Sequence, residues 1–120
     1  MAGIVFFSTR QIDILDDFYR RRIGCTLWLE QGGCRIYRHG NFLLGFCQRN
    51  RIDTEGIITF FFPTDDDVNR MYQQLKNEAE AAPVYSPRYV IYHFFASDPE
   101  GRKVEFQHFR GTINYDFKET

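Results

Sequence analysis

The segment SDPEGRKVEFQH, residues 97–108, carries the carboxylate that is best placed for chemistry in this chain. Residues 98–101 (DPEG) are turn-forming, and an alternating run of polar and apolar side chains follows from Lys103. In a strand with this pattern, Glu105 faces away from its apolar neighbours and toward the opposite side of the sheet. Such a carboxylate could be a metal ligand, a general base or an ordinary surface group.

The histidines His39, His93 and His108 are the other side chains that could take part in chemistry. In the apolar run 89–96, His93 and Phe95 share one face, and we expect that face to look inward. Glu105 and His93 are then candidates for an acid–base pair. Single histidines in sheets are more often hydrogen-bonded structural residues, and a metal site built from these three histidines is a further alternative.

The elements that must position these residues follow one pattern twice. Two segments have helical periodicity: residues 12–23, which end at Gly24, and residues 68–79, which begin after a capping Thr64. Each segment is preceded by one β-rich run and followed by three more. The predicted strands cover residues 4–7, 26–30, 35–38, 42–48, 57–62, 84–86, 89–96 and 103–109.

This order predicts an α+β protein built from two tandem βαβββ modules. The modules cover residues 1–48 and 57–109, with a polar linker at 49–56, and together form a single domain over 1–110. A shift of 53 residues places Gly3 on Gly56. We expect two curved mixed sheets that form a cup, with the helices on the outer faces and a polar tail at 111–120.

Composition limits the class of protein. The chain has 120 residues, 43% of them hydrophobic and 26% charged, as expected for a globular domain. A net charge of −1 disfavours nucleic acid as a partner, and no apolar run is long enough to cross a membrane. The first ten residues lack the pattern of a secretion signal, so we expect a cytoplasmic protein. In that setting the three cysteines, Cys25, Cys34 and Cys47, are expected to be free thiols.

Three motifs resemble the vicinal oxygen chelate superfamily, which includes glyoxalase I, bleomycin resistance proteins and extradiol dioxygenases. They are FYRRRIGC at 18–25, DVNRMYQQLK at 67–76 and DPEGRKVEF at 98–106, and their order and spacing match over residues 3–109. The resemblance implies a divalent metal ion at the centre of the cup in the metal-dependent members. The ligands there come from the first and last strands of each module, and Glu105 matches one of them.

The other ligand positions carry unsuitable side chains. The first strand offers Ile4, and the last strand of the first module offers Leu44 or Gly45. Residues 57–62 offer only Thr59 among apolar side chains. A lone carboxylate holds a divalent ion poorly, so we expect a protein without a metal cofactor.

The metal-free branch implies a homodimer that binds a small organic molecule, in the manner of the bleomycin resistance proteins. The alternatives are a lyase or dioxygenase of the same fold that holds one divalent metal ion with atypical ligands, and a regulatory domain whose cup its own aromatic residues fill. The sequence leaves open whether any reaction is catalysed, which ligand is bound and how the dimer is arranged.

Aromatic residues make up 18% of the chain, enough to fill a core and also to line a cavity. The predicted ligand-binding residues are Trp28, Tyr37, Phe46, His93, Phe95, Glu105 and Gln107. A carboxylate in such a cavity needs a compensating cation. An arginine of the sheets (Arg35, Arg38 or Arg88) could supply it, as could a flat, positively charged ligand.

Overall fold

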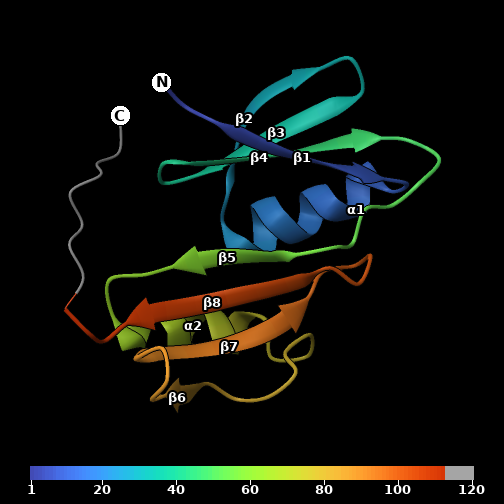
Figure 1. The fold of residues 1–120 in the computed structure, drawn as a ribbon. Helices are drawn as coiled ribbons and strands as arrows, with labels where there is room; N and C mark the ends of the chain where they lie inside the picture. Colours follow the sequence, from blue (N-terminus) through green and yellow to red (C-terminus); the bar gives the residue numbers. More distant parts are fainter. Residues whose placement is uncertain (113–120) are drawn as a thin grey trace. The chain divides into compact units, whose positions relative to one another are not determined.

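The computed structural model describes residues 1–112 and divides them into two compact units, residues 1–54 and residues 55–112 (Figure 1). Each unit contains a four-stranded sheet and a helical segment. Most of the predicted tail at 111–120 lies outside the described residues. The cup that the two sheets would form together stays a prediction.

The first unit contains one mixed sheet with the strand order β1-β4-β3-β2. Its strands are β1 (Ile4–Thr9), β2 (Thr26–Gln31), β3 (Cys34–His39) and β4 (Phe42–Gln48). Strand β1 is parallel to β4, and the other pairs are antiparallel. The helical segment begins as α1 (Ile12–Asp16) and continues as a π-helix, η1 (Asp17–Ile23). It ends as predicted at Gly24, whose φ of 99° is a left-handed conformation that glycine adopts readily.

The second unit repeats this topology with the order β5-β8-β7-β6. Its elements are β5 (Ile57–Phe61), α2 (Asp65–Gln74), β6 (Val84–Ser86), β7 (Ile91–Ser97) and β8 (Lys103–Phe109). The side chain of Thr64 accepts a hydrogen bond from the backbone N–H of Asp67, which confirms the predicted helix start. Helix α2 is shorter than predicted, and Ala79 pairs instead with Ala96 in an isolated β-bridge.

The α+β architecture with two βαβββ modules is therefore confirmed. The repeat is visible in the strand starts, because Ile4 begins β1 and Ile57 begins β5, at the predicted offset. In both units the first strand is parallel to the last one, which lies in the interior of the sheet. No helix within residues 1–112 is long and apolar enough to span a membrane.

Aromatic rings fill both cores on the helix side of each sheet. In the first unit Tyr19 of η1 lies against Phe46 of β4, with 4.9 Å between ring centres. In the second unit Tyr72 of α2 meets Phe94 of β7 at 5.5 Å, and Phe94 stacks on Phe106 of β8 at 5.1 Å. A large share of the aromatic residues therefore serves packing.

The expectation of three free thiols is wrong, because Cys34 and Cys47 form a disulfide bond. The two residues are direct partners in the antiparallel pair of β3 and β4. The adjacent pair is hydrogen-bonded, since Gln48 N–H donates to the carbonyl of Gly33. Cys34 and Cys47 therefore occupy a non-hydrogen-bonded pair, in which side chains approach closely across the strands. Cys25 is a buried free thiol, and burial raises its pKa to about 12.

Candidate functional site

The candidate site lies on one face of the second sheet, opposite α2. Because Phe94 and Phe106 face α2, alternation turns their neighbours Phe95 and Glu105 to the other side. The strand register places further side chains of β5, β7 and β8 on the same side of the sheet as Phe95 and Glu105. We call the resulting surface the Glu105 face, and it comprises Ile57, Thr59, Phe61, Ile91, His93, Phe95, Ser97, Lys103, Glu105, Gln107 and Phe109.

Glu105 is the centre of a hydrogen-bonded cluster on this face. Its Oε2 lies 2.7 Å from Nδ1 of His93. Its Oε1 accepts a hydrogen bond of 2.9 Å from the Thr59 hydroxyl and a longer one of 3.4 Å from the Gln107 amide. Three strands therefore contribute to one carboxylate: β5 through Thr59, β7 through His93 and β8 through Glu105 and Gln107.

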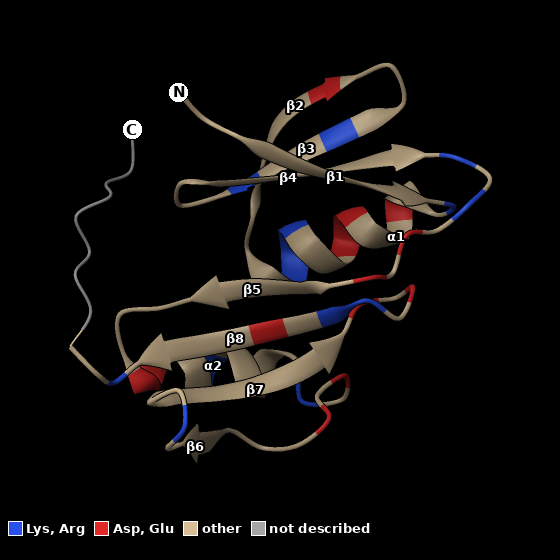
Figure 2. Ribbon diagram, in the orientation of Figure 1, with Lys and Arg blue, Asp and Glu red and all other residues tan. Residues whose placement is uncertain are grey.

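The imidazole of His93 contacts the Glu105 carboxylate, and each of the three arginines considered from the sequence has another partner. Arg35 binds Glu30 and Asp13 in the first unit. Arg38 donates to the carbonyl of Gly40, and Arg88 lies over the ring of Tyr89. Strand β8 itself contains one acidic residue, Glu105, and one basic residue, Lys103, and Figure 2 shows one red and one blue segment on it.

The contact with Glu105 holds the imidazole ring of His93 in one orientation. The side chains are 14% and 11% exposed, so both are largely withdrawn from solvent. A carboxylate that holds Nδ1 of a histidine fixes the ring and leaves Nε2 to exchange a proton with a bound molecule. His93 also meets the edge of the Phe95 ring at 5.2 Å, which limits its rotation. The predicted pairing of Glu105 with His93 is thus present as a contact, while its catalytic use stays a prediction.

The strand register identifies the side chains next to the expected metal ligand. Thr59 of β5 lies directly opposite Glu105, and a hydroxyl is a weak ligand for a divalent ion. In the first unit the corresponding pair is Phe6 and Gly45. The ring of Phe6 lies over Gly45 so closely that a Cβ there would be 2.4 Å from it. Within residues 1–112 no three His, Cys, Asp or Glu side chains are close enough together to hold a metal ion.

The other histidines lie apart from this cluster. His108 is the strand partner of Tyr92 and so lies on the helix side of the sheet, opposite to the face of His93. Its Nδ1 is 3.0 Å from the carbonyl oxygen of Phe62. His39 ends β3 in the first unit. His93 and His108 therefore cannot contribute to a common site on one face of the sheet.

Three of the predicted ligand-binding residues lie in the first unit. Tyr37 and Phe46 have no exposed surface and pack in the core toward the helix, so we leave them out of the candidate site. Trp28 is half exposed on β2, at an irregularity where the pairing with β3 shifts. This bulge interrupts the regular alternation of side chains along β2.

The Tyr37 hydroxyl donates a hydrogen bond of 2.6 Å to Oδ1 of Asp16. Burial, followed by the contact with Asp16, raises the pKa of Tyr37 above its usual value. The folded protein then keeps this proton at a pH where the unfolded chain has lost it. The contribution to stability is therefore present below about pH 10 and is lost as the pH rises further.

Replacement of Tyr37 by phenylalanine is expected to cost about 1 kcal/mol at neutral pH, because Asp16 loses a donor. The same variant should lose less stability than the wild type between about pH 8 and about pH 11. Urea unfolding at both pH values checks this, with Tyr89→Phe as a control on an exposed tyrosine. Identical pH dependence in Tyr37→Phe and in the wild type would contradict it.

Sequence reasoning missed Thr59 as a member of the cluster, although it is the one polar residue of β5. Lys103 was also not among the predicted ligand-binding residues, although it lies on the same face with Nζ 4.5 Å from the centre of the Phe95 ring and 3.6 Å from Glu80. A polar residue within an apolar strand was the available signal for Thr59.

The sequence matches no protein-family model and no curated protein. Solved structures do resemble it. A glyoxalase/bleomycin resistance protein/dioxygenase family enzyme from Burkholderia phytofirmans PsJN is similar with a TM-score of 0.76 and 17% identity, covering 88% of this chain and 96% of its own. The lactoylglutathione lyase of Agrobacterium tumefaciens has a TM-score of 0.74 and 17% identity over 92% and 94% of the two chains. A glyoxalase-related enzyme from Fulvimarina pelagi has a TM-score of 0.79 and 12% identity over 100% and 96%.

At these identities the likeness is one of fold. The chain has the fold of the glyoxalase/bleomycin resistance/dioxygenase proteins, which confirms the resemblance drawn from its three motifs at that level. Function must be argued from the residues of the site.

Proposed function

We propose that this chain, which has the glyoxalase/bleomycin resistance/dioxygenase fold, binds a small organic molecule on its Glu105 face without a metal cofactor. The observation that carries the proposal is the Glu105 carboxylate, which is held by His93, Thr59 and Gln107 and flanked by aromatic rings. A fixed carboxylate beside aromatic surface suits a flat, positively charged molecule.

The surroundings of Glu105 support a cationic ligand. Phe61 and Phe109 meet edge to face at 5.5 Å beside Gln107, and Phe95 lies directly across from Glu105. Lys103 already places an ammonium group over the Phe95 ring, so this face can hold a cation against an aromatic surface. Of the eleven side chains on the face, Glu105 is the one carboxylate.

The absence of a metal cofactor is part of the proposal. Both oxygens of Glu105 are engaged by neighbouring side chains, and its partner on β5 is a threonine. The alternative is a metal-dependent lyase or dioxygenase in which Glu105 and His93 act as atypical ligands, and their 2.7 Å contact is the observation in its favour. Elemental analysis of protein purified without chelators separates the two, since stoichiometric manganese, nickel, zinc or iron would overturn the metal-free proposal.

Glu105→Gln tests the ligand proposal. We expect benzyltrimethylammonium to raise the melting temperature of the wild type, and its Kd to weaken at least about tenfold in Glu105→Gln because the charge pair is lost. Benzoate, with the opposite charge, should not stabilise either protein. Thermal shift and calorimetric titration provide the readouts.

Asp66→Asn is the matched control, because it removes one carboxylate from an exposed position at the start of α2, in the same unit. It should leave binding of benzyltrimethylammonium unchanged. Stabilisation by benzoate alone, or equal binding by Glu105→Gln and the wild type, would contradict the proposal.

We also propose that the protein acts in the cytoplasm as a homodimer. The edge strand β2 exposes Leu27, Trp28 and Leu29 side by side, an apolar surface that association would cover. Sedimentation of the wild type and of Trp28→Lys tests this: a dimer that dissociates in the variant is expected, and a monomeric wild type would contradict it.

A further inference from the structure

A pocket of about 460 Å³ lies in the first unit, and the Cys34–Cys47 disulfide forms part of its wall. Strand β1 contributes a second part of the wall, and the segment after β4 contributes Arg49, Arg51 and Asp53. Strand register places both sulfur-bearing residues on the same face as Ser8, opposite to the aromatic core under the helix. The pocket therefore lies on the face of the first sheet that is opposite to the core of this unit.

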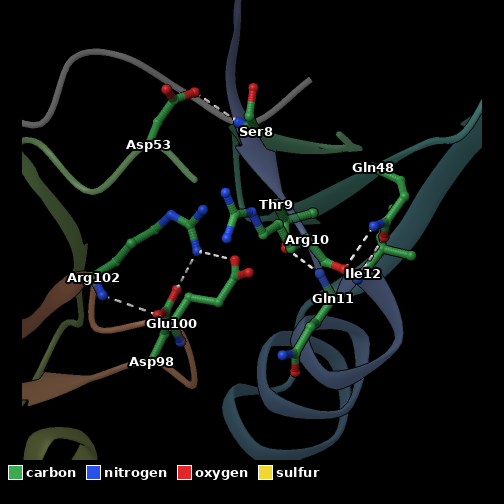
Figure 3. A network of polar contacts seen from close by, with 10 residues as sticks. All are labelled: Ser8, Thr9, Arg10, Gln11, Ile12, Gln48, Asp53, Asp98, Glu100 and Arg102. Atoms are coloured by element: carbon green, nitrogen blue, oxygen red, sulfur yellow. Dashed lines mark hydrogen bonds and ion pairs between the residues drawn. The ribbon is translucent and has the colours of Figure 1, made fainter. Parts of the chain in front are cut away.

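The charged wall of this pocket is held in place by backbone hydrogen bonds. Arg49 N–H donates to the carbonyl of Thr9, and Asp53 N–H donates to the carbonyl of Ser8. Asp53 Oδ2 in turn accepts a hydrogen bond of 2.7 Å from Ser8 N–H (Figure 3). Arg51 lies between these anchored residues, with its guanidinium 3.9 Å from Asp53. The segment after β4 thus keeps two cations and one anion beside the disulfide, and the loop between β4 and β5 carries both basic and acidic segments in Figure 2.

The strand pairing allows the disulfide to open without loss of the sheet. Cys34 and Cys47 occupy a non-hydrogen-bonded pair, while the neighbouring Gly33 and Gln48 hold the strands together. Reduced thiols would remain opposite each other. Cys34 is partly exposed, whereas Cys47 is 5% exposed, so we take Cys34 as the end of the disulfide that a dissolved thiol attacks.

We propose that the Cys34–Cys47 disulfide is a site of reversible thiol–disulfide exchange, and that its pocket selects small anionic thiols. A thiolate attacks Sγ of Cys34, a new S–S bond forms, and the protein S–S bond breaks with its electron pair leaving on Sγ of Cys47. A second thiolate then attacks the mixed disulfide and releases the symmetric disulfide of the small thiol. Two thiols are oxidised and the protein disulfide is reduced to two thiols.

The charges of the wall account for the selectivity. Arg49 and Arg51 outnumber Asp53, so the pocket carries a net positive charge that attracts an anionic reagent and stabilises the departing thiolate. Because these side chains are near the solvent, the effect should weaken as salt is added.

The test compares three thiols of different charge: 2-mercaptoethanesulfonate, 2-mercaptoethanol and cysteamine. Reduction of the oxidised full chain is followed by alkylation and mass spectrometry, and each rate is divided by the rate of that thiol with an uncharged reference disulfide. At low ionic strength we expect the anionic thiol to exceed the cationic one by at least about fivefold after this normalisation. Arg49→Gln/Arg51→Gln should remove the difference.

Arg20→Gln/Arg21→Gln is the matched control, because it removes two exposed arginines from η1 of the same unit. It should keep the preference for the anionic thiol. Equal normalised rates for the three thiols would overturn the proposed selectivity. A disulfide that resists all three thiols while Trp28 fluorescence stays native would overturn the exchange site itself.

Discussion

Phe106→Ala is expected to lower the free energy of unfolding of the second unit by about 3–5 kcal/mol, the range for loss of a buried phenylalanine. Phe106 has no exposed surface. Its ring stacks against Phe60 at 5.6 Å, Phe94 at 5.1 Å and Phe62 at 6.3 Å. Removal of this ring leaves a cavity that three neighbouring rings cannot fill without moving. Urea unfolding followed by circular dichroism measures the loss, and hydrogen exchange of the β7 and β8 amides locates it.

Phe109→Ala is the control for this prediction. Phe109 belongs to the same strand, but it lies on the Glu105 face, is half-buried and contacts Phe61. Its loss should cost about 1–2 kcal/mol, since less apolar surface returns to water. Equal losses in both variants would contradict the assignment of the core to the α2 side of the sheet.

The fold was predictable from the sequence because each element carries its own local signal. Alternation marks the strands, Gly24 ends the first helical segment, and Thr64 caps α2. The boundaries that were missed depend on tertiary contacts. Ala79 has helical spacing, but it pairs with Ala96 of β7 instead. At the start of β7, Val90 adopts a positive φ of 56° in the preceding turn, which no propensity of valine indicates.

Within the site, strand parity predicted which residues of β7 and β8 share a face. Glu105, His93 and Phe95 share a face as expected, because β7 and β8 pair in regular register. Tyr37 and Phe46 were named as ligand-binding residues without such an argument, and they face the helix, since Tyr37 reaches Asp16 and Phe46 meets Tyr19. The alternation of side chains along a strand determines which residues share a face. Which of the two faces the helix covers depends on tertiary packing.

The disulfide was predictable from a pattern that was not used. Cys34 lies six residues before Gly40, and Cys47 lies six residues after Asn41. A hairpin that turns at Gly40 and Asn41 therefore places the two cysteines opposite each other. Free thiols were expected because the protein was expected to be cytoplasmic, a reducing compartment. The strand register is the stronger argument, because it places the two sulfur atoms within reach of each other.

Opening the Cys34–Cys47 disulfide is expected to lower the free energy of unfolding of the first unit by about 2–3 kcal/mol. The bond closes a loop with a sequence separation of 13, and cross-links of this size restrict the unfolded chain by about that amount. Urea unfolding followed by the fluorescence of Trp28, the only tryptophan, reports on this unit. Wild-type protein should shift to a lower midpoint in tris(2-carboxyethyl)phosphine, while Cys34→Ser/Cys47→Ser should start at the lower midpoint and not respond.

The response to reductant must belong to this pair and not to Cys25. Burial raises the pKa of Cys25 to about 12, so almost none of this thiol is in the reactive thiolate form at neutral pH. Cys25→Ala should therefore shift with reductant by the same amount as the wild type, although its absolute stability falls because a buried side chain is shortened. Two results would refute the prediction: a double serine variant as stable as the oxidised wild type, or a Cys25→Ala protein that no longer responds to reductant. If both controls behave as expected, the cross-link stabilises the sheet whose pocket it lines, and exchange at Cys34 changes stability and pocket chemistry together.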